Sequence, residues 1–461
     1  MKPLKFIVSL LLLLPALALL AFGPRSERVA PKDVVVVEYW EKWTGEEAVA
    51  IRQIADDFNR TVGKEKGIYV NCLSTSGVVQ KTLISTAAGV PPDVAGLWDT
   101  IVAQFAALDA LEPLDELAAA HGITPDTYKK VFWDECSYDG KLYALVTTPY
   151  DFALHYNTRI FAESADRLRA AGLDPSRPPR TIAELDAYAA ALDRVGPDGT
   201  IQLTGFLPLE PGWDLGFIGS WFGGSWWDEK NKKFTFTDPK VVQAYTWVQS
   251  YSKRLGKAAV SDFRGGFGNF DSPQNPFMAG TVAMENQGTF MANFIRNQNP
   301  KMAGQWAAAP FPSAVPGVND ITYCTADVMV IPKGAKNKKE AFEFIAYVNS
   351  QPVMEKLCSL HCKISPLAKV SDEFIRNHGN PYVKVFDDLA ASPRAYGTPS
   401  VPIFPQVSEE ISNFVQNLAQ MRVTPEQGLA EMQVRLQGKY DAFMEKQRLR
   451  RVAEDQGQGR Q

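Results

Sequence analysis

The sequence has little of what would point to a charged partner or a metal centre. Its 461 residues carry a formal net charge of only −4, so the charge balance gives no reason to expect a nucleic-acid partner. Only four histidines occur, and they are scattered singly. The chain has five cysteines: Cys72, Cys136, Cys324, Cys358 and Cys362. Because this is an odd number, at least one thiol stays unpaired.

Cys358 and Cys362 are one helical turn apart if they lie on a helix. That spacing falls inside the usual Cα range of a disulfide, although the helix would have to distort locally to close it. His361 lies between them, but no fourth ligand follows at a zinc-like spacing. We therefore expect ordinary thiols or a disulfide, and neither a metal nor another cofactor.

Long apolar runs are missing after the first 23 residues. Within the first 23 residues, Lys2 and Lys5 precede an apolar run from Phe6 to Phe22, which is typical of an export signal. The run could be cleaved after Pro15 and its small neighbours, or remain as an N-terminal anchor. Because no cysteine lies near the end of this run, the sequence argues against a lipid-anchored form. In either case we expect the rest of the chain to work outside the inner membrane.

Aromatic residues are well represented at 11%, and they fall at the ends of predicted strands. The N-terminal part alternates strands and helices, which predicts a mostly parallel sheet with helices on its faces. The expected strands are 34–40, 68–73 and 93–99, and the expected helices are 46–61, 78–88 and 100–108. Ligands bind at the loops after the carboxyl ends of such strands.

Three of these strand ends carry aromatic or polar side chains: 40–45, 74–77 and 97–99. Trp40 falls within the alternation of its strand and is expected in the core. Trp43 lies beyond the strand and is expected as an aromatic platform facing a cleft.

The chain is too long for one hydrophobic core, so two lobes are expected. The extended stretch 143–157, with Pro149 at its middle, looks like a crossing between them. Four tryptophans occur among the glycines of 210–228, and we interpret this segment as a loop wall beside the cleft. Later segments predict further elements: helices from 181 to 192, from 238 and from 338 to 349, strands 306–312 and 325–332, and a chiefly helical stretch from 409 to 452.

Six segments follow one another in this order: W40-E-K-W-T-G45, G89-V-P-P-D-V-A-G-L-W-D99, D139-G-K-L-Y-A144, A153-L-H-Y-N157, P179-R-T-I-A-E-L185 and F277-M-A-G-T-V-A-M-E-N-Q-G288. In this order and spacing they resemble the extracellular solute-binding proteins of bacterial sugar ABC transporters, the group of the maltose- and multiple-sugar-binding proteins. The resemblance implies an α/β, two-lobe periplasmic-binding-protein fold of type II-like topology, with several hinge crossings and a ligand cleft between the lobes.

On this reading, residues 1–23 are the signal peptide or anchor, and 451–461 are a frayed tail. One lobe comprises 33–148 and 311–363, and the other comprises 149–310 and 364–450.

The resemblance places ligand contacts at 41–45, at 98–99, at 150–151 and at 287–290. Together with the strand-end loops and the tryptophan-rich segment, the expected ligand-binding residues are Glu41, Trp43, Thr44, Gly45, Ser76, Trp98, Asp99, Tyr150, Asp151, Trp213, Trp221, Gln287, Gly288 and Phe290. Phe290 replaces a tryptophan that is frequent in the family, and Tyr150-Asp151 replaces a usual glutamate, so the particular sugar stays open.

The resemblance implies the substrate-binding component of an ABC importer, which binds a carbohydrate and delivers it to permease subunits of the inner membrane. We expect a periplasmic monomer without catalytic activity. Two alternatives remain: the same fold binding glycerol phosphate or another polar solute, and a secreted enzyme acting on glycans. No Walker loop, G-x-S-x-G or H-E-x-x-H motif occurs to support an enzyme.

Overall fold

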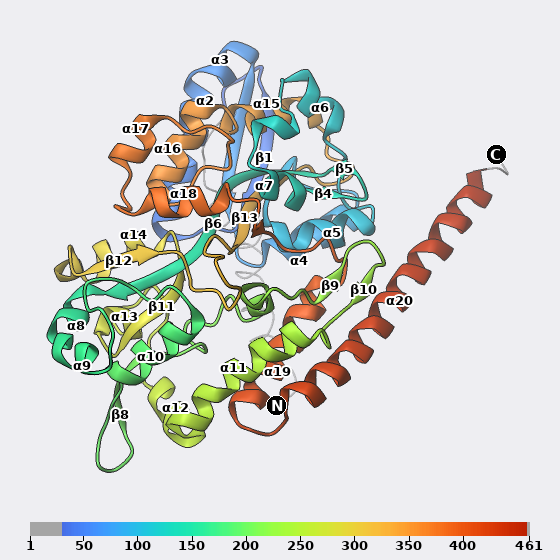
Figure 1. Ribbon diagram of the computed structural model, residues 1–461. Helices are drawn as coiled ribbons and strands as arrows, with labels where there is room; N and C mark the ends of the chain where they lie inside the picture. Colours follow the sequence, from blue (N-terminus) through green and yellow to red (C-terminus); the bar gives the residue numbers. More distant parts are fainter. Residues whose placement is uncertain (1–29, 459–461) are drawn as a thin grey trace, which may run out of the picture.

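The computed structural model describes residues 30–458, and the expected export signal lies outside the described residues. Figure 1 shows two lobes, one above the other, joined by long strands. One ten-stranded sheet runs through both lobes in the order β2-β1-β3-β13-β6-β11-β8-β7, with β12 beside β6 and β14 beside β13. The two-lobe α/β fold predicted from the sequence is therefore confirmed.

The first lobe contains the parallel strands that the alternation predicted. Strand β1 (Val35–Glu41) pairs in parallel with β2 (Ile68–Ser74) and β3 (Val94–Trp98). The helices of this region are α2 (Gly45–Arg60), α3 (Val62–Lys66), α4 (Val78–Ala87), α5 (Asp99–Ala107), α6 (Asp115–Ala120) and α7 (Lys130–Glu135). Apolar side chains at helical spacing bury one face of α2, including Ile51, Ile54 and Phe58.

Two strands carry the sheet from one lobe to the other. Strand β6 (Ala144–Asn157) pairs first with β13 (Thr322–Val330), then with β11 (Val282–Gly288) and β12 (Trp306–Ala309), always antiparallel. The sheet is thus parallel only in part. Pro149 lies opposite Ala326, and the register shifts next to it, between Asp327 and Val328. The expected crossing at 143–157 is confirmed.

The second lobe completes the sheet and holds a second group of strands and helices. They are α8 (Thr158–Glu163), α9 (Ala165–Ala170), α10 (Ile182–Leu192), β7 (Arg194–Val195), β8 (Ile201–Phe206), α11 (Pro239–Leu255), α12 (Lys257–Gly265), α13 (Pro276–Ala279), α14 (Met291–Gln298) and α19 (Phe404–Ala419). Asp238 caps α11 by accepting the N–H of Lys240 at 2.7 Å, and Pro239 is its first residue, as the sequence predicts.

The rest of the chain adds helices to the first lobe and short pairs of strands. These are α15 (Lys338–Val348), α16 (Gln351–His361), α17 (Asp372–Asn377), α18 (Val383–Ala390), the hairpins β4 (Ser137–Tyr138) with β5 (Lys141–Leu142) and β9 (Trp227–Asp228) with β10 (Lys233–Phe234), and β14 (Ala395–Tyr396). The long helix α20 (Pro425–Gln458) projects from the body in Figure 1. It continues through 451–458, so this part of the expected frayed tail is helical.

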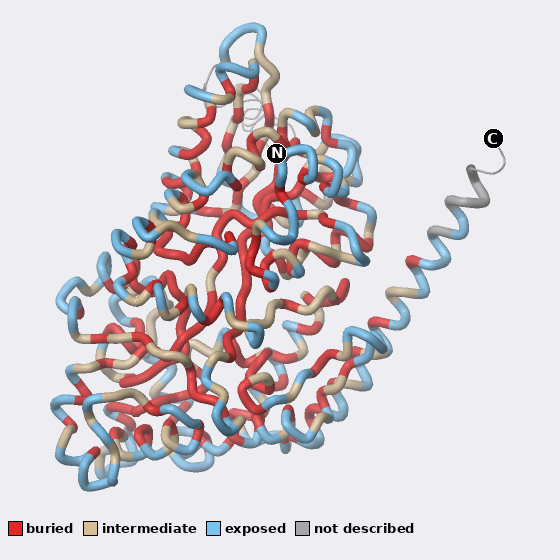
Figure 2. Tube along the Cα trace, turned by 45° about the horizontal axis from the view of Figure 1, so that its top comes forward, coloured by how far each residue is buried: buried red, intermediate tan, exposed pale blue. Residues whose placement is uncertain are grey.

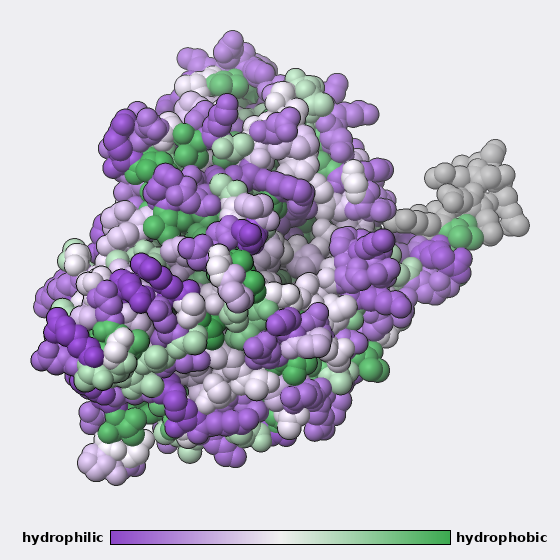
Figure 3. All heavy atoms as spheres, in the orientation of Figure 1, coloured by the Kyte–Doolittle hydropathy of each residue, from purple (hydrophilic) through white to green (hydrophobic). Residues whose placement is uncertain are grey.

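Two hydrophobic clusters form the core. Figure 2 shows buried segments running through the interior of the molecule, with exposed segments around them. The first cluster surrounds Phe58 and Phe344, and the second surrounds Trp221 and Tyr245. Helices α17 and α18 pack on the first cluster although they follow residue 363. The lobe boundaries stay a prediction. In Figure 3 hydrophilic side chains dominate the outer face, and hydrophobic ones form smaller patches among them.

All five cysteines are free and buried. Cys358 ends next to Met354, with 3.7 Å between the two sulfur atoms, and Cys362 adopts a left-handed backbone after α16 (φ 52°) with its sulfur 3.6 Å from Arg296. The disulfide alternative for this pair is therefore not what the structure contains. Within residues 30–458, no three His, Cys, Asp or Glu side chains gather as a metal site would need, and none of the helices is long and apolar enough to cross a membrane.

Candidate ligand-binding site

Two tryptophans stand out because they are exposed. Among the exposed large hydrophobic side chains of residues 30–458, Trp98 (40% exposed) and Trp213 (38%) are the aromatic ones. Trp98 ends β3 in the first lobe, and Trp213 belongs to the loop after β8 in the second. Both line two adjoining cavities of about 470 and 500 Å³. The half-buried Tyr150, on the crossing strand β6, lines both cavities as well.

Aromatic side chains of the second lobe continue this wall. Phe290 contacts the rings of Tyr150 and Trp213, with centroids 5.1 and 5.4 Å apart. Phe270 and Phe294 pack beside it and line the same cavity. The cavity is therefore framed by flat apolar surfaces from both lobes, which suits a ligand with an apolar face.

A buried ionic group forms one side of this cavity. Asp327, on β13, lies 3.1 Å from the ammonium of Lys42 and 2.7 Å from that of Lys363, and Thr148 donates to it at 2.9 Å. Burial alone would raise the pKa of Asp327, but Lys363 and Lys42 hold that pKa well below its usual range. Both ammonium groups lie over aromatic rings: Lys42 over Trp43 and Trp98, and Lys363 over Trp43 and Tyr150.

Six of the fourteen residues expected at the site line one or both cavities: Trp43, Thr44, Trp98, Tyr150, Trp213 and Phe290. The other eight do not: Glu41, Gly45, Ser76, Asp99, Asp151, Trp221, Gln287 and Gly288. Lining residues that the sequence reasoning missed include Glu47, Arg264, Phe270, Phe294, Thr325, Asp327 and Lys363. Lys42 also lines the cavity; it lies in the expected segment 41–45 but was not among the fourteen residues. Lys42 lies inside the tryptophan motif, whereas Asp327 and Lys363 reach the site only through the fold.

Trp43 differs from the free platform that was expected. It lines the cavity but is only 5% exposed, because Lys42, Lys363 and His361 surround its ring. The rings of Trp43 and His361 meet edge to face at 4.5 Å. Trp40, expected in the core, is only partly buried. The expected burial of the two tryptophans was therefore wrong, because Trp43 is the more buried of the pair.

Glu41 was expected to contact ligand but points into the first lobe. It is completely buried, and it accepts the backbone N–H of Lys42 at 2.7 Å, that of Trp43 at 3.2 Å, and the hydroxyl of Tyr39. A Cβ atom on Gly96 would lie 2.0 Å from its carboxylate, so Gly96 makes room for it. Glu41 thus shapes the turn at the end of β1 rather than the cavity.

Asp99 and Asp151 also turn away from the cavities. Asp99 accepts the hydroxyl of Thr325 at 2.7 Å, and burial raises its pKa to about 6. Asp151 accepts the hydroxyl of Thr289 at 3.0 Å, and burial raises its pKa well above the usual value. Each aspartate follows an aromatic residue that lines the cavities. Alternation along a strand sends Tyr150 and Asp151 to opposite faces.

Trp221 was expected to contact the ligand, but it belongs to the core. Its side chain is completely buried, and its indole N–H donates to the carbonyl of Ile321 at 3.1 Å. Gln287 and Gly288 lie in the buried strand β11. Gly45 opens α2 with a left-handed backbone (φ 56°), and Ser76 is exposed on the loop before α4.

Glu285, two residues before Gln287, is a buried acid that affects stability. Neither of its carboxylate oxygens has a hydrogen-bond partner among the described residues, and burial raises its pKa to about 8. Between pH 4.5 and 8 the folded protein keeps a proton that the unfolded chain loses, so stability falls as pH rises.

We expect Glu285→Gln to remove this decrease of the free energy of unfolding with rising pH. Its free energy of unfolding should exceed that of the wild type by about 4 kcal/mol at pH 8 and match it near pH 4.5. Urea unfolding of both proteins across this pH range measures the difference. Parallel pH profiles would show that Glu285 does not titrate as its burial implies.

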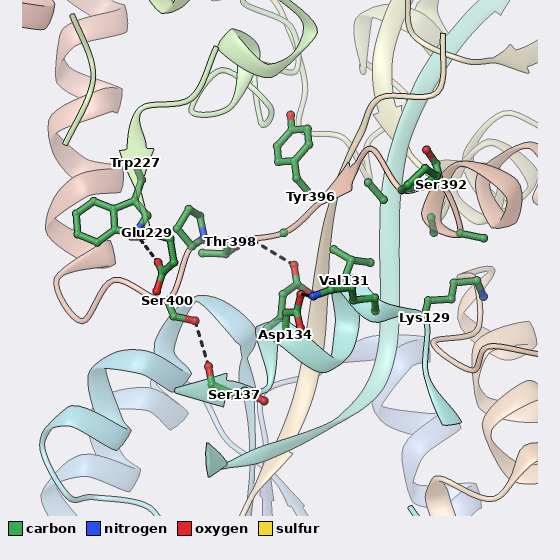
Figure 4. Close-up of a pocket in the computed structure, with 18 of the residues that line it drawn as sticks. Lys129, Val131, Asp134, Ser137, Trp227, Glu229, Ser392, Tyr396, Thr398 and Ser400 are labelled. Atoms are coloured by element: carbon green, nitrogen blue, oxygen red, sulfur yellow. Dashed lines mark hydrogen bonds and ion pairs between the residues drawn. The ribbon is translucent and has the colours of Figure 1, made fainter. Parts of the chain in front are cut away.

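A larger cavity, of about 1150 Å³, shares no lining residue with these two. It lies between α7, the β9–β10 hairpin and the segment 390–400 (Figure 4). Among its charged side chains, Lys130 pairs with Asp134, Lys232 with Glu229, and Lys129 with Asp387. Its tryptophan, Trp227, is 6% exposed and donates its indole N–H to Glu229 at 2.7 Å. The cavity therefore offers no exposed aromatic platform.

Comparison with known proteins agrees with the fold. The solved structure of CpMnBP1 with mannotriose bound is 26% identical and superposes with a TM-score of 0.72, covering 87% of this chain and 99% of that one. The sugar-binding protein MalE of Xanthomonas citri has 22% identity and a TM-score of 0.73, covering 90% and 98%, and shows the shared fold alone.

Curated relatives match over a shorter stretch. The sn-glycerol-3-phosphate-binding periplasmic protein UgpB of Pectobacterium atrosepticum is 25% identical over 285 residues, which is 58% of this chain and 57% of that protein. UgpB of Escherichia coli K12 is 27% identical over 269 residues, 55% of this chain and 56% of that protein. The chain thus spans little more than half the length of these relatives.

The family model matches a longer part of the chain. The model described as "Bacterial extracellular solute-binding protein" covers residues 53–379, well over half of the sequence. The family, like the similar solved structures, consists of binding proteins. This chain belongs to the bacterial extracellular solute-binding protein family.

Proposed function

We propose that this protein is the substrate-binding component of an ABC importer and binds a sugar or oligosaccharide between its lobes. The observation that carries the proposal is the pair of exposed rings, Trp98 from one lobe and Trp213 from the other, lining the same cavities. A sugar ring presents apolar C–H groups to flat aromatic surfaces and hydroxyl groups to polar side chains. Thr44, Glu47 and Lys42 would supply polar partners beside the rings.

Closure of the lobes would complete the site. A ligand that touches Trp98 and Trp213 together favours the closed form, because the open form offers it only one of these rings. A permease in the inner membrane could then distinguish the loaded, closed form from the empty one. On this proposal the protein acts in the periplasm as a monomer and does not convert its ligand.

Relatives support two ligand classes. CpMnBP1, of which the chain covers 99%, was solved with mannotriose and with mannobiose. UgpB, matched over little more than half its length, binds sn-glycerol 3-phosphate by its name. A phosphate ligand needs free cations or a free helix N-terminus. Arg264, which lines one cavity, is already paired with Glu210. We therefore favour the saccharide.

Calorimetry tests this function directly. We expect the protein without its first 23 residues to bind mannotriose or another short oligosaccharide at one site per chain, with no product released. Mannose, mannobiose, maltotriose and glycerol 3-phosphate are titrated alongside. Binding of glycerol 3-phosphate without binding of any saccharide would contradict the proposal. Release of shortened sugars would indicate an enzyme.

A further inference from the structure

The cavity that holds the exposed tryptophans contains four charged side chains that neutralise one another. The carboxylate of Asp327 bridges the ammonium groups of Lys42 and Lys363, one on each oxygen. Lys42 also lies 3.3 Å from Glu41, and Lys363 lies 3.6 Å from Glu47. The side chains of Asp327, Lys42 and Lys363 are each no more than 5% exposed.

The charge balance of the two cavities follows from their lining residues. Two cations, Lys42 and Lys363, face two carboxylates, Asp327 and Glu47. In the adjoining cavity the single charged lining residue, Arg264, is paired with Glu210. The lining residues described here therefore leave no uncompensated cation for an anionic ligand.

The position of Asp327 is fixed by the sheet. It lies on β13 directly opposite Trp98 of β3 and Thr148 of β6. Thr148 donates to the same oxygen that receives Lys363. Burial alone would lower the pKa of Lys363, but Asp327 and Glu47 raise it, so its ammonium stays charged. An ionised phosphate near Trp98 would approach the Asp327 carboxylate and be repelled.

We propose that Asp327 determines the ligand class of the cleft: it neutralises Lys42 and Lys363, so the cleft accepts uncharged saccharides and rejects phosphorylated ones. This inference rests on the proposed function and narrows it. An ammonium has three N–H groups, and Lys42 directs two towards Glu41 and Asp327. The third is available to a sugar hydroxyl.

Asp327→Asn tests the inference because it removes the charge and keeps the shape. We expect the wild type to bind neither glycerol 3-phosphate nor inorganic phosphate measurably. Asp327→Asn should gain affinity for glycerol 3-phosphate of at least about tenfold, decreasing steeply between 50 and 500 mM NaCl. Calorimetry measures both ligands, with mannotriose as the neutral probe.

Two further variants control for charge and position. Glu47→Gln removes one negative charge from a more exposed carboxylate, 3.6 Å from Lys363, so its gain in phosphate affinity should be smaller. Asp327→Asn combined with Lys42→Gln should lose the gain again, because one cation is then missing. Circular dichroism and urea unfolding establish that each variant is folded.

The outcomes separate the inference from the proposed function. A folded Asp327→Asn that binds glycerol 3-phosphate no better than wild type would overturn the inference, even if wild type binds mannotriose. Wild type that binds no saccharide would overturn the proposed function, and a gain of glycerol 3-phosphate affinity in Asp327→Asn would then still show that Asp327 controls the charge of the cleft. If Asp327→Asn does not fold, the wild type still decides: salt-sensitive binding of glycerol 3-phosphate would overturn the inference, and salt-independent binding of mannotriose alone would support it.

Discussion

Replacing Trp98 or Trp213 with alanine should remove most of the saccharide affinity and leave the fold stable. Each residue is about 40% exposed and lines the cavities, so its removal should cost less stability than removal of a fully buried tryptophan. In the proposed complex each would cover one face of the sugar, and anchoring aromatic residues of this kind contribute about 2 kcal/mol or more, roughly 30-fold in the dissociation constant. Calorimetry gives the affinity, and urea unfolding the stability.

A conservative variant sharpens this test. Trp98→Phe and Trp213→Phe keep a flat ring and should bind more tightly than the alanine variants. Alanine variants that retain wild-type affinity would show that the sugar does not lie between these rings. A large loss of stability in the same variants would show that the rings belong to the core after all.

Trp221→Ala should have the opposite effect. This side chain is completely buried, packs edge to face on Phe311 and Tyr396, and donates to the carbonyl of Ile321. Deleting it leaves a cavity and an unpaired carbonyl, so the free energy of unfolding should fall by about 3–5 kcal/mol. Urea unfolding measures this loss, and calorimetry below the transition should find the saccharide affinity largely retained.

The comparison with Trp213→Ala is matched, because the two tryptophans lie eight residues apart in one segment. Trp221→Ala with wild-type stability would contradict the burial described here. Equal effects of both variants on affinity would show that the segment acts as a unit.

These tryptophans show what the sequence could and could not predict. Periodicity placed the strands and helices to within a few residues, because burial of one face imposes a repeat of 2 or 3.6 residues. The glycines of 210–228 correctly argued against a regular helix there. They carried no information on which ring faces outward, since this depends on the packing of Trp221 against Phe311 and Tyr396, which lie far away in sequence.

The resemblance predicted segments of the site better than individual contacts. At 98–99 and 150–151 two neighbouring residues were both expected at the ligand, yet in each pair only the aromatic residue lines the cavities. Alternation along a strand could have separated Tyr150 from Asp151. Asp327 and Lys363 had no local signal, because their partners Lys42 and Thr148 lie far away in sequence.

The crossing strand β6 has a mechanical consequence. It belongs to both lobes at once, so the lobes are coupled through a continuous sheet and any change in their angle must bend or twist the strand itself. Pro149 offers no N–H to the neighbouring strand, and the register slips beside it, so the ladder is interrupted there. Tyr150 and Asp327 lie at this point. In the proposed complex, a ligand that contacts Tyr150 would therefore act on β6 where the ladder is already interrupted.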